Sequence, residues 1–297
     1  FFLLSVGATI HYSRGIEHLA SELTEVRPTI VTVVPRLLEV IRGRILSGLG
    51  RQPGWKRALF NAALAAGLRR EEGRASIADR LLDPLFDRLV RETVRARFGG
   101  RVKGVISGGA RLDPTVGKFF RALGIPLAQG YGQTEAGPVI SCSPIERVRI
   151  ETVGPPLEGV QVSFSDEGEI QIRGDLVMQG YWNNPAATQA TIHDGWLHTG
   201  DIGAQDADGY LRITDRKKDI LVMSGGDNVS PARIEGTLLA DPTIAQAVVF
   251  GDGKPYLVAV LVPSEAARKE FPGADALTKA MAGVVDAANK HLSVTER

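Results

Sequence analysis

Residues 125–137, IPLAQGYGQTEAG, combine a short apolar run with a glycine-rich segment. The apolar run at 125–128 predicts a buried strand, and we expect this strand to end in a loop flanked by Gly130 and Gly132. Glycine lets the backbone approach a ligand closely, and successive backbone N–H groups can form a concave site for an anion. Because open α/β sheets bind ligands at the ends of their strands, the stretch predicts an α/β fold with a ligand site here.

The same stretch continues with a hydroxyl and a carboxylate, Thr134 and Glu135. A threonine hydroxyl can donate a hydrogen bond to a phosphate oxygen. A carboxylate beside phosphates usually serves a divalent cation. The two side chains therefore predict a site for a nucleotide and its metal.

A second glycine turn precedes this stretch, because the expected strand 102–106 leads into Ser107-Gly-Gly-Ala110. Asp113 and Pro114 then supply an N-cap and a first helical residue for a helix over 115–123. Strand, turn, helix and strand make a βαβ unit with parallel strands. We expect its two glycine turns to lie side by side at one edge of the sheet.

The part of the chain before this unit shows no chemistry. We expect a strand within 1–10, a helix over 15–26, a buried strand over 29–34, and a helix that begins at Pro35. From 55 to 98 the pattern is helical, and it predicts one apolar face made by Ile77, Leu81, Leu85, Phe86, Leu89 and Phe98.

Beyond Gly154 the pattern changes to short alternating strands at 160–164, 169–173 and 210–214, which predict a small antiparallel sheet or barrel. Asp201, in GWLHTGD, follows a glycine, where a carboxylate can accept two hydrogen bonds from a diol such as a ribose. Such an aspartate caps a turn equally often. Strands and an alanine-rich helix after residue 217 predict a small α+β domain.

Composition excludes several classes of protein. The 35 Lys and Arg residues nearly balance the 34 Asp and Glu residues, and the net charge of +1 argues against bulk binding of nucleic acid. The single cysteine, Cys142, excludes an intrachain disulfide and suits a reducing compartment, so we expect a cytoplasmic protein. The apolar start is too short to span a bilayer.

Taken together, the motifs resemble those of the adenylate-forming enzymes, which include acyl-CoA synthetases, adenylation domains and firefly luciferase. The matching motifs occur in the family's order, and they are SGGARL (107–112), YGQTEAG (131–137), GEIQIRG (168–174), GYWNNPAAT (180–188), GWLHTGD (195–201) and DRKKDILVMSGGDNVSPARIE (215–235). PTIVTVVPRLLEVI (28–41) and the helical segment after it look most like long-chain fatty-acyl-CoA synthetases.

The resemblance implies an ATP/AMP site. Gly109, Ala110 and Tyr131 would frame the adenine, with Tyr131 stacked on it. Thr134 would bind the AMP phosphate, and Glu135 would hold Mg²⁺, which makes these two residues catalytic.

The resemblance also implies roles for residues further along the chain. Asp201 would bind the ribose hydroxyls with help from Arg216. Lys218 lies where the family has its hinge residue, and it would act in catalysis by letting the small domain rotate. The loop Ser224, Gly225 and Gly226 would then approach the thiol arm of CoA.

By this resemblance the chain is an ATP-dependent ligase that joins a long-chain fatty acid to CoA through an acyl-adenylate. Residues 1–216 would belong to the large AMP-binding domain, with an α/β layer at 1–150 and a barrel-like part at 151–216. Residues 217–297 would form the small mobile domain. A fatty substrate also suggests peripheral contact with a membrane.

Two family features are missing from the sequence, and both would fall outside its ends. They are a Ser/Thr/Gly-rich phosphate loop ending in Pro-Lys-Gly and a lysine that acts in adenylation. We therefore expect a chain truncated at both ends that adenylates poorly by itself. Two other functions stay open: a fatty-acyl-AMP ligase that passes the acyl group to a carrier protein, and a non-catalytic AMP-binding fragment or pseudoenzyme.

Overall fold

The computed structural model describes residues 5–15 and 18–296. The chain divides into two compact units. Unit 1 comprises residues 1–162, 172–197 and 205–212, and unit 2 comprises residues 163–171, 198–204 and 213–297. The domain boundary that the sequence predicts at residue 216 stays a prediction. No helix of the described residues is long and apolar enough to cross a membrane.

Unit 1 contains a four-stranded sheet in the order β1-β2-β3-β4. Its strands are β1 (Ile30–Val33), β2 (Gly104–Ser107), β3 (Leu127–Gly132) and β4 (Val139–Cys142). β1, β2 and β3 are parallel, whereas β4 pairs with β3 in the antiparallel direction. The βαβ unit predicted from the sequence is therefore confirmed.

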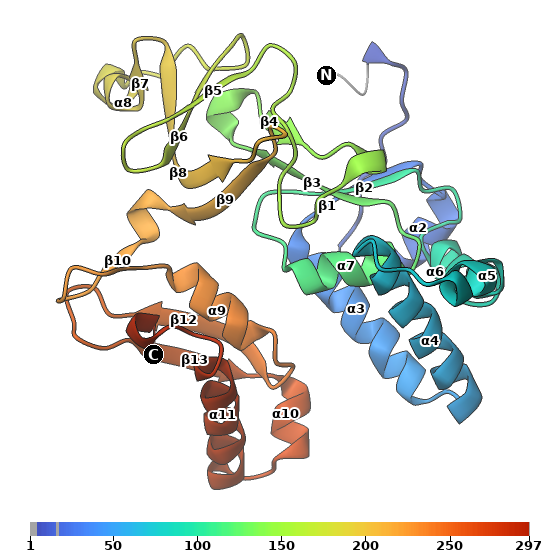
Figure 1. Ribbon diagram of the computed structural model, residues 1–297. Coiled ribbons are helices and arrows are strands. Elements are labelled where there is room, and N and C mark those ends of the chain that lie inside the picture. The colour runs from blue at the N-terminus through green and yellow to red at the C-terminus, as the bar shows by residue number, and fades with distance from the viewer. Residues whose placement is uncertain (1–4, 16–17, 297) are drawn as a thin grey trace. The chain divides into compact units, whose positions relative to one another are not determined.

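Helices cover this sheet. Unit 1 contains α2 (Leu19–Val26), α3 (Pro35–Gly50), α4 (Gly54–Glu71), α5 (Ile77–Phe86), a π-helix (Asp87–Arg91), α6 (Glu92–Arg97), α7 (Pro114–Ala122) and α8 (Pro185–Thr191). Figure 1 shows α3, α4 and α7 on the same side of the sheet. Helix α7 begins as expected, because the Asp113 carboxylate accepts hydrogen bonds from the N–H groups of Thr115 and Val116.

Two expectations about burial were wrong, and the strand expected within 1–10 is absent from the described residues 5–10. β1 is not a buried strand, because Ile30 is 57% exposed and the strand alternates between exposed and partly buried residues. The apolar face predicted for 77–98 is divided: Phe86 and Phe98 lie in the core, whereas Ile77, Leu81, Leu85 and Leu89 are exposed. Residues 1–4 lie outside the described part.

The remaining strands of the central region form a five-stranded sheet in the order β5-β6-β8-β7, with β9 paired to β8. They are β5 (Gln161–Phe164), β6 (Glu169–Arg173), β7 (Ile192–His193), β8 (Trp196–Gln205) and β9 (Leu211–Arg216). Their residues are divided between the two units. The sheet agrees with the short strands predicted from alternation and tight turns.

The rest of unit 2 is a small α+β arrangement, as predicted. It contains β10 (Leu221–Val222), β11 (Asn228–Val229), α9 (Pro231–Leu239), β12 (Ile244–Phe250), β13 (Val258–Pro263), α10 (Glu265–Glu270) and α11 (Ala274–Asn289). β12 and β13 are antiparallel. One face of β12 packs with α9 and α11 around a core that includes Ile234, Val249 and Val284.

Candidate functional site

The strand β3 carries the glycines that the sequence suggested for a loop. Gly130 and Gly132 both lie inside β3, and the irregular segment starts only at Gln133, so the expected break occurs later than predicted. A Cβ atom on Gly132 would collide with the carbonyl oxygen of Pro138. The close approach that requires Gly132 is therefore made by the chain's own backbone rather than by a ligand.

The two predicted glycine turns are neighbours in unit 1, as expected. Ser107, at the end of β2, pairs with Gln129 of β3. A Cβ atom on Gly108 would lie 3.5 Å from the carbonyl oxygen of Gly130. Gly109, with φ +77°, and Ala110 follow in an exposed loop. The carboxyl ends of two parallel strands thus present backbone at one edge of the sheet, where α/β folds bind ligands.

The segment after β3 presents polar side chains at this edge. Thr134 and Glu135 begin a short 3-10 turn, Thr134 is exposed, and Glu135 is partly buried. Among the described residues, the Thr134 hydroxyl has no hydrogen-bond partner and the Glu135 carboxylate has no cationic one. Tyr131, in β3, is partly buried. A hydroxyl donor and a carboxylate without a cation are thus available side by side.

Tyr181 is a further residue at this site, and the sequence analysis assigned it no role. Its hydroxyl donates a 2.9 Å hydrogen bond to Oε1 of Glu135, from 46 residues away in the chain. Desolvation of the ring hydroxyl and the neighbouring Glu135 carboxylate both raise the pKa of Tyr181. Tyr181 belongs to the GYWNNPAAT motif, but no local spacing indicates its partner.

Mg²⁺ fits the chemistry of this carboxylate. Mg²⁺ is usually held by one or two carboxylates together with substrate phosphates, and not by a cage of protein ligands. The hydrogen bond from Tyr181 occupies one oxygen of Glu135 and fixes the orientation of the carboxylate. Within residues 5–15 and 18–296, no group of three or more His, Cys, Asp or Glu side chains could hold a metal ion.

In unit 2, the structure brings Asp201 and Arg216 together. Nε of Arg216, at the end of β9, lies 3.0 Å from Oδ1 of Asp201 in β8. The Asp201 side chain is 4% exposed and that of Arg216 is 56% exposed. A buried carboxylate paired with an exposed guanidinium suits recognition of a ligand with hydroxyl and anionic groups.

The backbone that carries Asp201 is held by Glu169, which the sequence analysis did not single out. Oε1 of Glu169 accepts a 2.9 Å hydrogen bond from the N–H of Gly200. Oε2 lies 3.4 Å from Nζ of Lys217 and 3.5 Å from Nδ1 of His198. Glu169 is buried and belongs to GEIQIRG. It therefore ties β6 both to the residue before Asp201 and to the segment that contains Lys218.

The remaining predicted residues are exposed and lie in the same unit. Lys218 is in a 3-10 turn, Lys217–Asp219, directly after β9. Ser224, Gly225 and Gly226 form a turn between β10 and β11, in which Gly226 has φ +86° and donates its N–H to the carbonyl oxygen of Met223. The positive φ explains the glycine.

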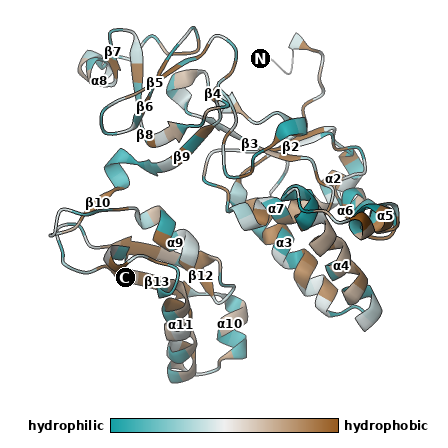
Figure 2. Ribbon diagram, in the orientation of Figure 1, coloured by the Kyte–Doolittle hydropathy of each residue, from teal (hydrophilic) through white to brown (hydrophobic). Residues whose placement is uncertain are grey.

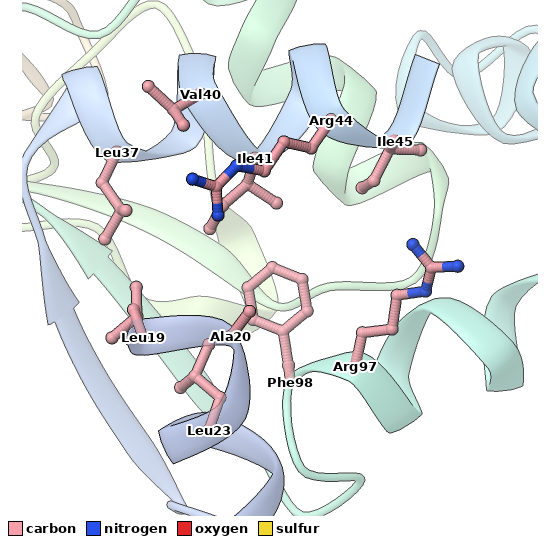
Figure 3. Close-up of a pocket in the computed structure, with 10 residues that line it drawn as sticks. All are labelled: Leu19, Ala20, Leu23, Leu37, Val40, Ile41, Arg44, Ile45, Arg97 and Phe98. Atoms are coloured by element: carbon pink, nitrogen blue, oxygen red, sulfur yellow. The ribbon is translucent and has the colours of Figure 1, made fainter. Parts of the chain in front are cut away.

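An apolar pocket lies elsewhere in unit 1, between α2, α3 and the end of α6 (Figure 3). Leu23, Leu37 and Phe98 contribute to its walls, and the side chains of Arg44 and Arg97 also line it. None of the predicted site residues lines this pocket. The chemistry suggested by the motifs therefore belongs to the strand ends and not to this pocket.

Comparison with known families gives two matches along the chain. Residues 1–182 match the model of the AMP-binding enzyme family. Residues 218–297 match the model of the AMP-binding enzyme C-terminal domain.

Curated relatives include long-chain-fatty-acid–CoA ligases. FadD15 of Mycobacterium bovis is 38% identical over 262 residues, which cover 85% of this chain and 42% of the relative. Long-chain-fatty-acid–CoA ligase 1 of Homo sapiens is 34% identical over 282 residues, which cover 88% of this chain and 39% of the relative. The chain thus spans about two fifths of the length of these relatives.

Solved structures with the same fold are adenylate-forming domains. The adenylation domain of a carboxylate reductase from Mycobacterium chelonae matches with a TM-score of 0.73 at 24% identity, over 98% of this chain and 44% of that one. The o-succinylbenzoate CoA synthetase of Bacillus subtilis was solved with its acyl-adenylate intermediate. It matches with a TM-score of 0.69 at 21% identity, over 99% of this chain and 51% of that one. From the family models and the shared fold, the chain belongs to the AMP-binding, adenylate-forming enzyme family, and its sequence resembles the long-chain acyl-CoA synthetases.

Proposed function

We propose that this chain is part of an ATP-dependent ligase that converts a long-chain fatty acid to its CoA thioester. In such a reaction a carboxylate oxygen attacks the α-phosphorus of ATP, and pyrophosphate leaves. The thiolate of CoA then attacks the acyl carbonyl of the acyl-adenylate, and AMP leaves. The family membership supports the adenylate chemistry, and the names of the relatives support the fatty acid and CoA.

The observation that carries the proposal is the pair Thr134 and Glu135 at the carboxyl edge of the sheet. The Thr134 hydroxyl would donate to an oxygen of the α-phosphate, where negative charge develops as the acid attacks. The Glu135 carboxylate, oriented by Tyr181, would hold Mg²⁺. When bound, Mg²⁺ would neutralise phosphate oxygens of the nucleotide.

Residues of unit 2 have the groups that would bind a ribose. The Asp201 carboxylate has the acceptor oxygens that a ribose diol requires, and the nearby Arg216 guanidinium would restrain the carboxylate while remaining able to contact an anion. Gly109, Ala110 and Tyr131 would frame the adenine. Glu169 would position Asp201 through the Gly200 N–H rather than by touching the ligand.

The second half-reaction needs a different set of groups. The turn Ser224, Gly225 and Gly226 presents small residues and backbone at the surface, which would let a CoA arm pass close to the chain. Rotation about Lys218 would exchange the groups used for adenylation for those used in thioester formation.

A test of the proposal supplies the acyl-adenylate directly, so that adenylation is not required. Purified chain is mixed with synthetic palmitoyl-adenylate and CoA, and palmitoyl-CoA and AMP are measured by mass spectrometry. We expect thioester formation above the uncatalysed rate, and less of it with acetyl-adenylate. A rate equal to the uncatalysed reaction with both adenylates would contradict the proposal. Faster transfer to a carrier-protein phosphopantetheine than to CoA would favour an acyl-AMP ligase instead.

The expectation that this chain adenylates poorly by itself stays a prediction. An ATP–pyrophosphate exchange assay with palmitate on the same polypeptide tests it. Exchange at or near background is expected, and robust exchange would overturn this expectation while supporting the ligase chemistry.

A further inference from the structure

Helix α5 and the π-helix that follows it carry a row of large apolar side chains that are exposed in the described structure. Ile77 is 78% exposed and Leu81 is 76% exposed. Leu82, Leu85 and Leu89 are each between 45% and 50% exposed. Figure 2 shows the hydrophobic residues along α5, in brown. We call the five residues Ile77, Leu81, Leu82, Leu85 and Leu89 the leucine stripe.

The stripe is not a loosely packed part of the core, because the same helical segment has a second apolar face that is buried. Phe86, Val90 and Val94 are each 6% exposed and belong to the main core of unit 1. Ile77, Leu81, Leu85 and Leu89 recur every four residues, which places them on one side of the helix. The segment therefore has an inner apolar face and an outer one.

Three acidic residues of this segment, Asp79, Asp83 and Asp87, are each paired with arginine. Asp79 accepts a 2.9 Å hydrogen bond from Nε of Arg69 in α4. Asp83 accepts hydrogen bonds from Arg91, at 2.6 Å, and from Arg70. Their negative charges are therefore matched by arginines of the same unit.

The same holds for Asp87, whose carboxylate makes two hydrogen bonds, of 2.8 and 2.7 Å, with Arg95 of α6. Asp79, Asp83 and Asp87 are thus compensated by arginines, whereas Glu92, the first residue of α6, is exposed and has no ion pair among the residues that the structure describes. Capping adds to the order of the helix, since Ser76 and Asp79 form a capping box at its start.

The basic residues beside the stripe, unlike these three acidic residues, are not part of an ion pair within the described part of the chain. Arg80 follows Ile77 by three residues and Arg88 follows Leu85 by three, a spacing that makes helical side chains neighbours. Both arginines are exposed. The outer side of the helix thus combines exposed leucines with two arginines that lack an acidic partner.

We propose that the leucine stripe docks on the surface of an anionic lipid bilayer. A helix with leucines on one face and arginines beside them lies in the plane of a membrane interface, with its apolar side chains below the headgroups. Anionic lipids supply the negative charge that Arg80 and Arg88 lack. A second copy of this chain is a poorer occupant, because two stripes packed together would bring like charges close. The proposal does not depend on the proposed function.

Cosedimentation with vesicles tests the proposal on the whole chain. The vesicles contain phosphatidylcholine alone or phosphatidylcholine and phosphatidylglycerol in equal parts. Leu81→Gln with Leu85→Gln removes two leucines of the stripe, and Arg80→Gln with Arg88→Gln removes the two arginines. Each variant has a matched control at exposed positions elsewhere. The control for the leucines is Leu46→Gln with Leu239→Gln, and the control for the arginines is Arg51→Gln with Arg57→Gln.

Wild type should bind the anionic vesicles, and binding should weaken as salt is added. The arginine variant should bind about 30-fold more weakly, from about fivefold for each charge. The leucine variant should bind at least about tenfold more weakly, and both controls should bind like wild type. Equal binding by all variants, or no binding by wild type, would overturn the proposal. So would a concentration-dependent dimer in light scattering that Leu81→Gln with Leu85→Gln abolishes.

Discussion

Replacing Glu169 with alanine should destabilise unit 2 and loosen the segment that carries Asp201. The Glu169 side chain is 7% exposed, and its carboxylate accepts a 2.9 Å hydrogen bond from the Gly200 N–H. Alanine would leave that N–H without its partner, and it would remove the negative charge that Lys217 and His198 face. Glutamine keeps an acceptor oxygen but loses the charge.

The expected change in the free energy of unfolding follows from these contacts. A hydrogen bond to a charged group contributes about 1.5–3 kcal/mol, and the half-exposed amine of Lys217 adds less than about 1 kcal/mol. We therefore expect Glu169→Ala to lower the free energy of unfolding by about 2–3 kcal/mol and Glu169→Gln by about 1–2 kcal/mol. Glu167 also pairs with Lys217, at 2.6 Å, but its side chain is 68% exposed. Glu167→Gln is thus the matched control and should change stability by less than about 0.5 kcal/mol.

The effect of Glu169 should depend on pH. Burial acts to raise the pKa of Glu169, but the Gly200 N–H, Lys217 and His198 outweigh it, and the net pKa lies below the ordinary value. A lowered pKa in the folded state stabilises the protein above the unfolded pKa of about 4.3, and this stabilisation is lost as the pH falls through the folded value. The difference between wild type and Glu169→Gln should therefore be full near neutral pH and shrink below about pH 4.

Urea unfolding followed by circular dichroism, at neutral pH and in acid, measures these differences. Because the chain contains two units, the transition of unit 2 has to be fitted separately. Equal stability of Glu169→Ala and Glu167→Gln, or a difference between wild type and Glu169→Gln that does not shrink in acid, would refute the reasoning.

Two further predictions concern unit 1. Gly132→Ala would force a methyl group against the Pro138 carbonyl oxygen, so it should cost about 3 kcal/mol in a thermal or urea unfolding assay. Gly48→Ala, where a Cβ meets nothing within 4 Å on a helix, should instead stabilise by about 1 kcal/mol, and equal effects would contradict the account. Tyr181→Phe removes the 2.9 Å hydrogen bond to Glu135 and should weaken binding of Mg²⁺ with ATP about fivefold in calorimetry; unchanged binding would remove Tyr181 from the site.

Much of the fold could be predicted because its signals are local. The N-cap Asp113, the first-turn prolines Pro35 and Pro114, and the alternation of short strands each depend on residues a few positions apart. The same holds for Ser230, which caps α9 by accepting a hydrogen bond from the Arg233 N–H. These signals identify elements well because the energies behind them come from neighbouring residues.

Burial was predicted less well, because it depends on which elements pack together. Ile77 and Leu81 match a helical apolar pattern as well as Phe86 does, and the sequence cannot show that the helix has two apolar faces of which one packs in the core. Ile30 lies in a β-branched run typical of buried strands, and yet it is exposed.

The motif residues of the candidate site were identified from the sequence, but their partners were not. Tyr181 bonds to Glu135 across 46 residues, and Glu169 bonds to Gly200 across 31. Neither separation corresponds to a helical or strand period, so only the folded chain reveals the contact. Gly132 shows the reverse case, since a glycine suggestive of a ligand site is required by the backbone of Pro138.

The most direct test of the account is calorimetric titration of AMP into this chain and into two variants, Thr134→Ala and Asp201→Asn. Binding requires no catalysis, so it tests the residues whether or not the chain adenylates. We predict saturable binding of one AMP, weaker by at least about tenfold in each variant, since Thr134→Ala removes a hydrogen bond to a charged phosphate and Asp201→Asn removes the charge of the acceptor. Absence of AMP binding to a folded wild-type chain, or equal affinity in all three proteins, would contradict the account.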